Sequence, residues 1–131
     1  MKLKIILPNI IYALALIVAA VMPSGAAYNN KKIELPFVLR LDYLIHCFAY
    51  MGFYFLVILI NLARKGAYPA KYYLHLFIAT LVLAVGTEFI QLFLSYRTFN
   101  PFDILANFTG AALGMIILFI CSKYQRKSFL Y

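Results

Sequence analysis

The stretch Tyr72–Leu94, with the sequence YYLHLFIATLVLAVGTEFIQLFL, decides the fold of this chain. It is longer than the roughly 20 mostly apolar residues that a helix needs to cross a bilayer, and it carries one acid, Glu88. Inserting an ionised carboxylate at such a position into a membrane costs roughly 2.5 to 3.5 kcal/mol, so we expect Glu88 to have an interaction partner or a functional role. The stretch therefore predicts a membrane-spanning helix with a functional residue inside it.

The composition of the whole chain agrees with this interpretation. Hydrophobic residues make up 66% of its 131 residues and charged residues 12%, against about 45 to 50% and about 25% in soluble proteins. Short joints separate four apolar stretches that qualify as spans, at 5–22, 43–62, 72–94 and 104–121. We predict an all-α polytopic membrane protein, a compact four-helix bundle that forms the single domain 1–131.

The first apolar stretch has a second interpretation. Lys2 and Lys4 precede it, and Ser24-Gly25-Ala26-Ala27 follows it in the manner of a signal-peptide cleavage site. The stretch is, however, longer than the roughly 7 to 15 residues of a usual signal core. Cleavage would also leave three helices to satisfy the polar positions. We predict a retained span, with cleavage as the alternative.

Positive charge beside the spans predicts their orientation, because Lys and Arg near helix ends are retained on the cytoplasmic side. One side has Lys2, Lys4, Arg64, Lys65, Lys71, Lys123, Arg126 and Lys127, and the other has Lys31, Lys32, Arg40 and Arg97. Both termini are therefore predicted to be cytoplasmic. Since these residues are scattered at helix ends rather than gathered in a stripe, the net charge of +8 indicates topology and anionic lipid, and no nucleic-acid partner is expected.

The acidic residues gather on the opposite, outer side. These are Glu34, Asp42, Glu88 and Asp103. Asp42 and His46 are four residues apart at the start of the second predicted helix, so they share a helix face. Glu88 and Gln91 share a face near the end of the third helix. Polar groups of two helices are thus expected at one depth.

The fourth predicted helix repeats the pattern. Asp103 and Asn107 share a face near its start, and Arg97 lies in the preceding turn, where we expect it to neutralise the neighbouring acids. On the same face, Gly110 and Gly114 permit close approach of another helix. We predict one ligand-binding site near the outer leaflet, lined by Asp42, His46, Glu88, Gln91, Arg97, Asp103 and Asn107.

Structural roles remain open for several of these residues. Asn100 can cap the fourth helix, with Pro101 and Asp103 in its first turn, and the dipole of the second helix can explain Asp42 in the same way. Amides such as Gln91 can simply bridge helices. Glu88 has no such explanation, because the C-terminal part of a helix disfavours negative charge.

These polar residues also lie in motifs that resemble a known family. The segment Leu41–Tyr50 resembles the Asp-x-x-x-His-x-x-x-Tyr segment of VanZ-like membrane proteins, with Tyr43 where that family usually has a basic residue. Glu88–Gln91 is similar to its Glu-x-x-Gln motif, and Arg97–Asn107, followed by Gly110, to its Arg-x-x-(Asp/Asn)-x-x-Asp-x-x-x-Asn and Gly pattern. With Met22-Pro23 as the opening segment, the resemblance covers about 22–114.

The resemblance implies a small multi-pass protein of the bacterial cytoplasmic (inner) membrane. Some relatives are linked to resistance toward antibiotics of the teicoplanin kind. The first functional hypothesis is accordingly a binding protein for a polar lipid headgroup, a cell-envelope component or a lipoglycopeptide. In it, Arg97 engages an anionic group, and Glu88 and Asp103 receive an amine.

Two further functions fit the same residues. One is a membrane-embedded enzyme acting on a lipid-linked or cell-wall substrate with Glu88 or His46 as general base, which lacks a recognised nucleophile motif. The other is a structural or partner-binding subunit of open oligomeric state. Membrane lipids are the expected partners and no cofactor is expected. We also expect no metal ion among Asp42, His46, Glu88 and Asp103, because Arg97 would repel it.

Overall fold

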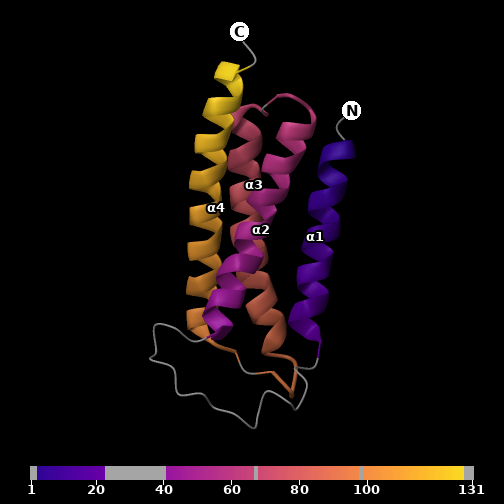
Figure 1. Cartoon of the computed structure of the whole chain (residues 1–131). Coiled ribbons are helices and arrows are strands. Elements are labelled where there is room, and N and C mark those ends of the chain that lie inside the picture. The colour runs from indigo at the N-terminus through magenta and orange to yellow at the C-terminus, as the bar shows by residue number, and fades with distance from the viewer. Residues whose placement is uncertain (1–2, 23–40, 67, 98, 129–131) are drawn as a thin grey trace.

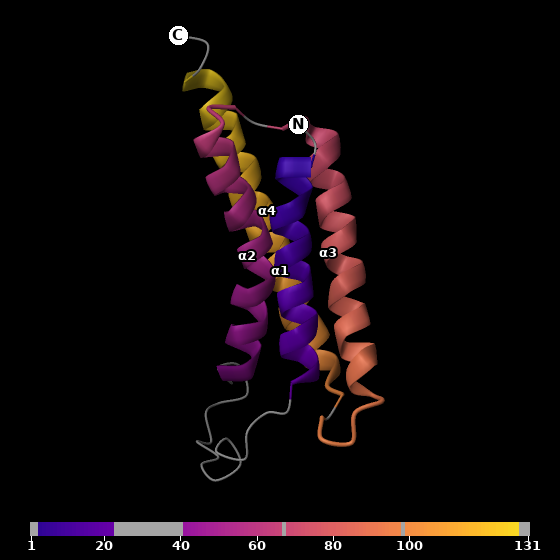
Figure 2. The same ribbon diagram turned by 90° about the vertical axis from the view of Figure 1, so that its right-hand side faces the viewer.

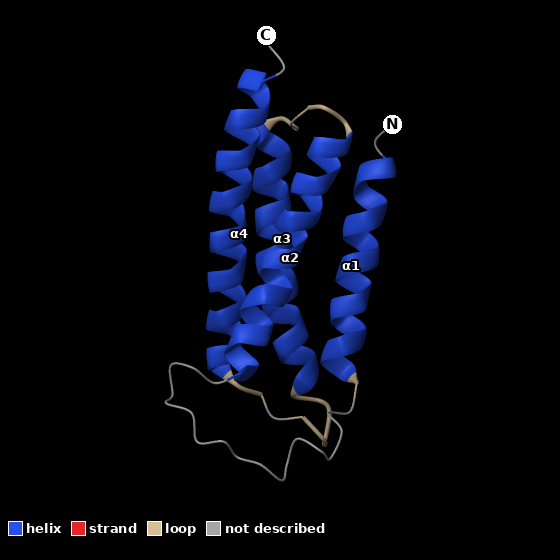
Figure 3. Cartoon of the chain, in the orientation of Figure 1, coloured by secondary structure: helices blue, strands red, loops and turns tan. Residues whose placement is uncertain are grey.

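The computed structural model describes residues 3–22, 41–66, 68–97 and 99–128, and in these ranges the chain forms four helices and no strand (Figure 3). They are α1 (Leu3–Val21), α2 (Leu41–Ala63), α3 (Ala70–Gln91) and α4 (Pro101–Ser128). Consecutive helices run in opposite directions (Figure 1). At the loop end of the bundle, α1 and α3 end and α2 and α4 begin; at the terminal end, α1 and α3 begin and α2 and α4 end.

The helices have the length and composition of a multi-pass membrane protein. Three of them are long and apolar enough to cross a membrane, namely α2, α3 and residues Pro101–Gln125 of α4. The fourth, α1, is apolar over the shorter stretch Ile6–Val21. The prediction of an all-α polytopic bundle is confirmed, with α1 as the shortest apolar segment.

The helices differ from the predicted spans by one to seven residues at their ends, and two of these differences have a clear local cause. The third helix ends at Gln91 rather than at 94, because the amides of Leu92, Phe93 and Leu94 bond to carbonyls three residues back, at 3.2, 3.1 and 3.1 Å. The predicted span was too long because the apolar sequence continues past the end of the helix. Hydropathy indicates contact with lipid and does not report the backbone conformation. The fourth helix starts earlier than 104, at Pro101, where the Asn100 side-chain oxygen accepts from the Phe102 amide at 3.1 Å, as a helix cap does.

The most extensive helix contact joins α2 and α4. Gly110 of α4 lies so close to α2 that a Cβ atom there would overlap the carbonyl oxygen of Cys47. One turn further along, a Cβ on Gly114 would overlap the ring of Tyr54, which is fully buried. The predicted close approach through the two glycines is confirmed, and it fixes the position of α4 against α2.

Helix α1 lies on the opposite side of α2 and α3 from α4 (Figures 1 and 2). Its Tyr12 hydroxyl donates to the Ala49 carbonyl of α2 at 2.8 Å, and the Tyr12 ring meets Phe53 edge-on with the centroids 4.8 Å apart. Toward α3, the Asn9 amide donates to the Tyr72 hydroxyl at 3.2 Å. These contacts attach α1 to both neighbours over its first half.

A buried polar network joins three helices at the terminal end. The Tyr73 hydroxyl of α3 accepts hydrogen bonds from the Asn61 amide of α2 at 3.0 Å and the Tyr68 backbone amide at 2.9 Å, and it is hydrogen-bonded to the Ser122 hydroxyl of α4 at 3.0 Å. The sequence analysis did not single out this network. It holds α2, α3 and α4 together at the end of the bundle opposite the predicted site.

Several features considered in the sequence lie outside the described residues. They are the candidate cleavage site 24–27, Pro23 of the family-like opening segment, Glu34, and the basic residues Lys2, Lys31, Lys32 and Arg40.

The contact of α2 with α4 gives a stability prediction. Gly110→Ala should lower the free energy of unfolding by about 1 to 3 kcal/mol, because the added methyl group has to displace the α2 backbone at Cys47. Thermal unfolding in mild detergent measures the effect. Gly86→Ala in α3 is the matched control, since nothing lies within 4 Å of a Cβ there. Equal losses in the two variants would contradict the close approach.

Candidate functional site

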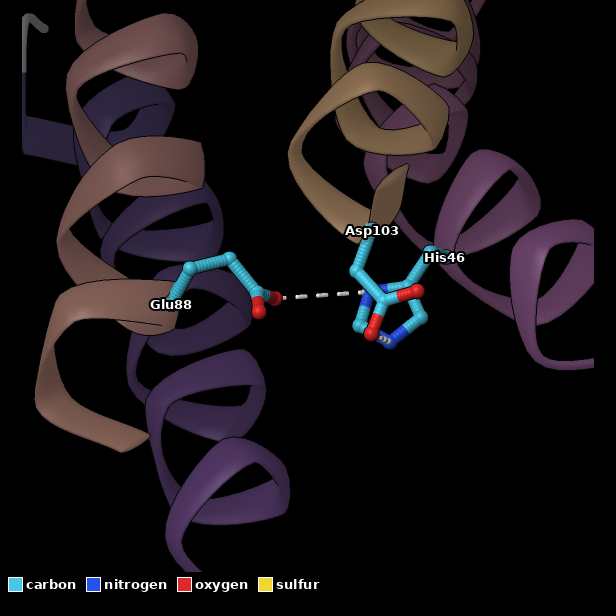
Figure 4. A group of neighbouring side chains, drawn as sticks. All are labelled: His46, Glu88 and Asp103. Atoms are coloured by element: carbon cyan, nitrogen blue, oxygen red, sulfur yellow. Dashed lines mark ion pairs between the residues drawn. The ribbon is translucent and has the colours of Figure 1, made fainter. Parts of the chain in front are cut away.

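Side chains from three helices meet at the loop end of the bundle. His46 of α2, Glu88 of α3 and Asp103 of α4 point toward one another (Figure 4). The His46 Nδ1 atom lies 3.8 Å from Glu88 Oε1, and its Nε2 atom lies 3.8 Å from Asp103 Oδ2. One potential ligand atom from each residue lies within 4.8 Å of the others. We call these three residues the His–Glu–Asp cluster.

Asn107 sets the orientation of the His46 ring. The Nδ1 atom of His46 lies 3.0 Å from the Oδ1 atom of Asn107, which is fully buried one turn after Asp103. An amide oxygen can only accept a hydrogen bond, so Nδ1 carries the hydrogen and, in the neutral ring, Nε2 has the lone pair. The His46 side chain is 27% exposed, so the cluster can be reached from outside the bundle.

Glu88 is the least compensated polar side chain of the cluster. It is 0% exposed, and among the residues that the structure describes neither of its carboxylate oxygens has a hydrogen-bond partner. Leaving a buried carboxylate without hydrogen bonds is costly, because the hydrogen bonds it made to water are not replaced. The carboxylate therefore has unused capacity to bind a donor or a cation.

Two neighbours of Glu88, Thr87 and Tyr50, are hydrogen-bonded without it. The Thr87 hydroxyl donates to the Ala84 carbonyl at 3.2 Å and lies 2.8 Å from the Tyr50 hydroxyl of α2. Because the single Thr87 proton goes to Ala84, Tyr50 is the donor in the second contact. Tyr50 and Thr87 thus connect α2 to α3 directly beside Glu88. Sequence analysis did not assign them to the site, although Tyr50 is four residues after His46 and Thr87 precedes Glu88.

Asp103 combines the two roles that its sequence left open. Its Oδ1 atom accepts from the Asn100 side-chain amide at 3.0 Å, and it lies in the first turn of α4, where the helix dipole favours a negative charge. Its Oδ2 atom faces His46. The helix start therefore positions this carboxylate for the cluster.

Arg97 lies against the C-terminal end of α1. Its Nη2 atom donates to the carbonyl oxygens of Ala19 at 3.0 Å and Met22 at 2.6 Å. These hydrogen bonds go to the last turn of α1, whose carbonyls have no partner within their own helix. The role of Arg97 in neutralising the acids stays a prediction. A cation there also complements the negative end of the helix dipole.

Two further side chains hold the same turn of α1. The Gln91 amide donates to the Ala20 carbonyl at 3.4 Å, and the Tyr96 hydroxyl donates to the Val21 carbonyl at 2.7 Å. Together with Arg97 they occupy the four carbonyls of residues 19–22, and we call the three the α1 clamp. Tyr96 was missed in the sequence, because nothing local shows that the turn after α3 meets the end of α1.

Comparison with known proteins places this arrangement in a family. A family model described as VanZ/LLP1 matches residues 9–122, from the first turns of α1 to near the end of α4. The chain belongs to the VanZ/LLP1 family. The family resemblance found in the sequence is thereby confirmed.

One curated relative of this VanZ/LLP1 chain is "Uncharacterized protein C11E3.10" of the fission yeast Schizosaccharomyces pombe. It is 46% identical over 39 residues, which is 30% of this chain and 24% of the relative. The match thus spans about a quarter of the yeast protein. No solved structure matches the chain.

Six of the seven predicted site residues of the VanZ/LLP1 chain divide into two groups. The structure brings Asn107 together with the His–Glu–Asp cluster and assigns Gln91 and Arg97 to the α1 clamp. Asp42 lies in the first turn of α2, half-buried and four residues before His46, and it is not among the three clustered ligand residues.

The α1 clamp gives a second stability prediction. Arg97→Met should lower the free energy of unfolding by about 1 kcal/mol, at the low end for charged hydrogen bonds because these two hydrogen bonds are exposed. Hydrogen exchange of the last α1 amides should become faster. Lys123→Met removes an exposed positive charge of α4 and is the control. Unchanged exchange in α1 of the Arg97 variant would show that the clamp does not hold this helix.

Proposed function

We propose that this VanZ/LLP1 protein binds the polar headgroup of a membrane amphiphile at the His–Glu–Asp cluster. The observation that carries the proposal is the fully buried Glu88, which is aimed at His46 and has no hydrogen bond at either oxygen within the described ranges. Buried polar groups that serve only the fold are nearly always hydrogen-bonded. A bound polar group would supply the partners that Glu88 lacks.

Charge indicates which part of the headgroup enters. Glu88 and Asp103 contribute two carboxylates against the single imidazole of His46, so the cluster attracts the positive pole of its ligand. Arg97 lies in the turn between α3 and α4 and has more N–H groups than the α1 clamp uses. A headgroup with an anionic phosphate or carboxylate can place that part toward Arg97.

The surroundings of the cluster suit an amphiphile. Beside His46, α2 exposes Ile45 at 55% and Phe48 at 61%, and α4 exposes Leu105 at 60% near Asp103. Such apolar side chains on a spanning helix face lipid chains. A ligand with an acyl tail can therefore keep the tail in the bilayer while its headgroup reaches the cluster.

The alternative of a purely structural cluster receives less support. The Tyr73 network joins the three helices at the terminal end, and the glycines of α4 fix α4 against α2. Both contacts hold the bundle without the Glu88 carboxylate. The cluster is then available for a ligand.

We also propose that the loop end faces outward from a bacterial cytoplasmic membrane. The described basic residues Arg64, Lys65, Lys71 and Lys123 lie at the terminal end, which supports a cytoplasmic position for that end. The likeness to VanZ-like proteins supports the bacterial setting and a lower susceptibility to teicoplanin-type antibiotics.

Native mass spectrometry of the detergent-purified protein tests the binding proposal. The original protein should retain a discrete lipid or envelope fragment that Glu88→Gln loses, because glutamine keeps the shape but removes the charge that attracts the ligand. His75→Gln is the control, since His75 is exposed near the start of α3, at the other end of the bundle. Retention of the same mass by Glu88→Gln would refute the proposal. Loss of the mass only with loss of folding would favour a structural role.

Antibiotic susceptibility tests the physiological part of the proposal. Expression in a teicoplanin-susceptible bacterium should raise the minimum inhibitory concentration of teicoplanin, and Glu88→Gln expressed at the same level should raise it less. The His75→Gln variant should behave as the original protein does. The same inhibitory concentration with and without the protein would remove the antibiotic from the proposal and leave the headgroup site to be judged by mass spectrometry.

A further inference from the structure

We infer that the His–Glu–Asp cluster binds one first-row divalent transition-metal ion, such as Zn²⁺ or Mn²⁺, through His46, Glu88 and Asp103. Where the ion is taken to connect the cluster to a bound headgroup, this inference rests on the proposed function. The metal site itself can be measured with no headgroup present.

The spacing of the three residues suits a shared ion better than direct hydrogen bonds. The Nε2 atom of His46 lies 3.8 Å from Asp103 Oδ2, and its Nδ1 atom lies 3.8 Å from Glu88 Oε1, so both contacts are beyond hydrogen-bond distance. Nitrogen and oxygen ligands of Zn²⁺ lie about 2.0 to 2.2 Å from the ion, so two ligands of one ion are roughly 3 to 4 Å apart. The candidate atoms all lie within 4.8 Å of one another, so small side-chain rotations close the site.

Two of the three ligands are already oriented by neighbouring amides. A metal-binding histidine usually donates its other ring N–H to an acceptor, and His46 Nδ1 donates to Asn107, which leaves Nε2 toward Asp103. Carboxylate ligands are likewise hydrogen-bonded on their free side. Asp103 fits this arrangement, because Asn100 donates to its Oδ1 atom and its Oδ2 atom faces His46.

Glu88 provides the independent sign that a ligand belongs here. It is 0% exposed, its carboxylate oxygens have no hydrogen-bond partner, and it is aimed into the cluster (Figure 4). A divalent ion would give this carboxylate a partner. With a neutral imidazole, the negative charges of Glu88 and Asp103 also match the charge of the ion.

The type of ligand indicates the type of ion. Mg²⁺ and Ca²⁺ prefer oxygen ligands alone, whereas imidazole together with carboxylates suits transition metals such as Zn²⁺. Three protein ligands leave a further coordination position open. An oxygen atom of a phosphate or carboxylate headgroup could occupy this position and so connect the metal to the proposed ligand.

The sequence argued against a metal because of the positive charge of Arg97. In the structure, the Nη2 atom of Arg97 donates to Ala19 and Met22 in the last turn of α1. The carbonyls of the α1 end thus engage this guanidinium group. The charge of Arg97 is partly balanced there, and the ground for excluding an ion is correspondingly weaker.

Metal titration of the full chain tests the inference. The protein, stripped with a chelator and exchanged into lipid-free detergent, should bind about one Zn²⁺ or Mn²⁺ per chain, counted by elemental mass spectrometry. Glu88→Gln, Asp103→Asn and His46→Gln should each weaken binding by more than tenfold, since each removes a ligand. Asn107→Ala should weaken it by about tenfold through the freed His46 ring. His75→Gln is the control and should bind as the original does.

A second measurement keeps the inference testable if a variant fails to fold. Nitrogen-15 NMR of histidine-labelled original protein should show Zn²⁺ shifting the His46 ring resonances and leaving those of His75 unchanged. Absence of a bound ion, or binding that survives His46→Gln, would overturn the inference. Zn²⁺ binding by a protein that retains no lipid would support the metal site and count against the proposed function. Lipid retained after chelation by a protein that binds no metal would overturn the metal site and support the proposed function.

Discussion

The site depends above all on the close contact between α2 and α4. Gly110 allows the α4 backbone to approach the carbonyl of Cys47, which is the residue directly after His46. Asn107 lies one turn before Gly110, so the same contact brings Asn107 to within 3.0 Å of His46. Asp103 lies one turn earlier still and faces the other nitrogen of the ring. A glycine, which contributes no functional group, thus determines where the polar groups of two helices meet.

The third helix makes fewer close contacts with α2 than α4 does, and this explains why Glu88 does not form a hydrogen bond with His46. Side chains connect α3 to α2 at two levels, by Thr87 with Tyr50 beside the cluster and by Tyr73 with Asn61 at the terminal end. The long tyrosines keep the two backbones apart, and α2 makes far fewer close contacts with α3 than with α4. Glu88 therefore reaches toward His46 but stops at 3.8 Å, too far for a hydrogen bond.

Sequence alone predicted what depends on length, composition and helical spacing. These include the four apolar segments, the face shared by Asp103 and Asn107, and the glycine contact. It could not identify the partner of Arg97, because that partner is the end of α1, more than seventy residues earlier, and only the packing order of the helices brings the two together. The Tyr73 network was missed for a related reason, since a single Asn61 or Ser122 within an apolar span gives little signal of its own.

The contrast between the two ends of the bundle is the strongest argument that the cluster serves a ligand. At the terminal end, the buried Tyr73 hydroxyl makes three hydrogen bonds with protein groups. At the loop end, the equally buried Glu88 receives none at either oxygen from the described residues. Within a membrane no water is at hand to compensate, and each unsatisfied polar group costs several kcal/mol. In the described part of the chain, the fold that satisfies Tyr73 leaves this carboxylate without a hydrogen bond and 3.8 Å from the His46 ring, which is expected where an external partner completes the site.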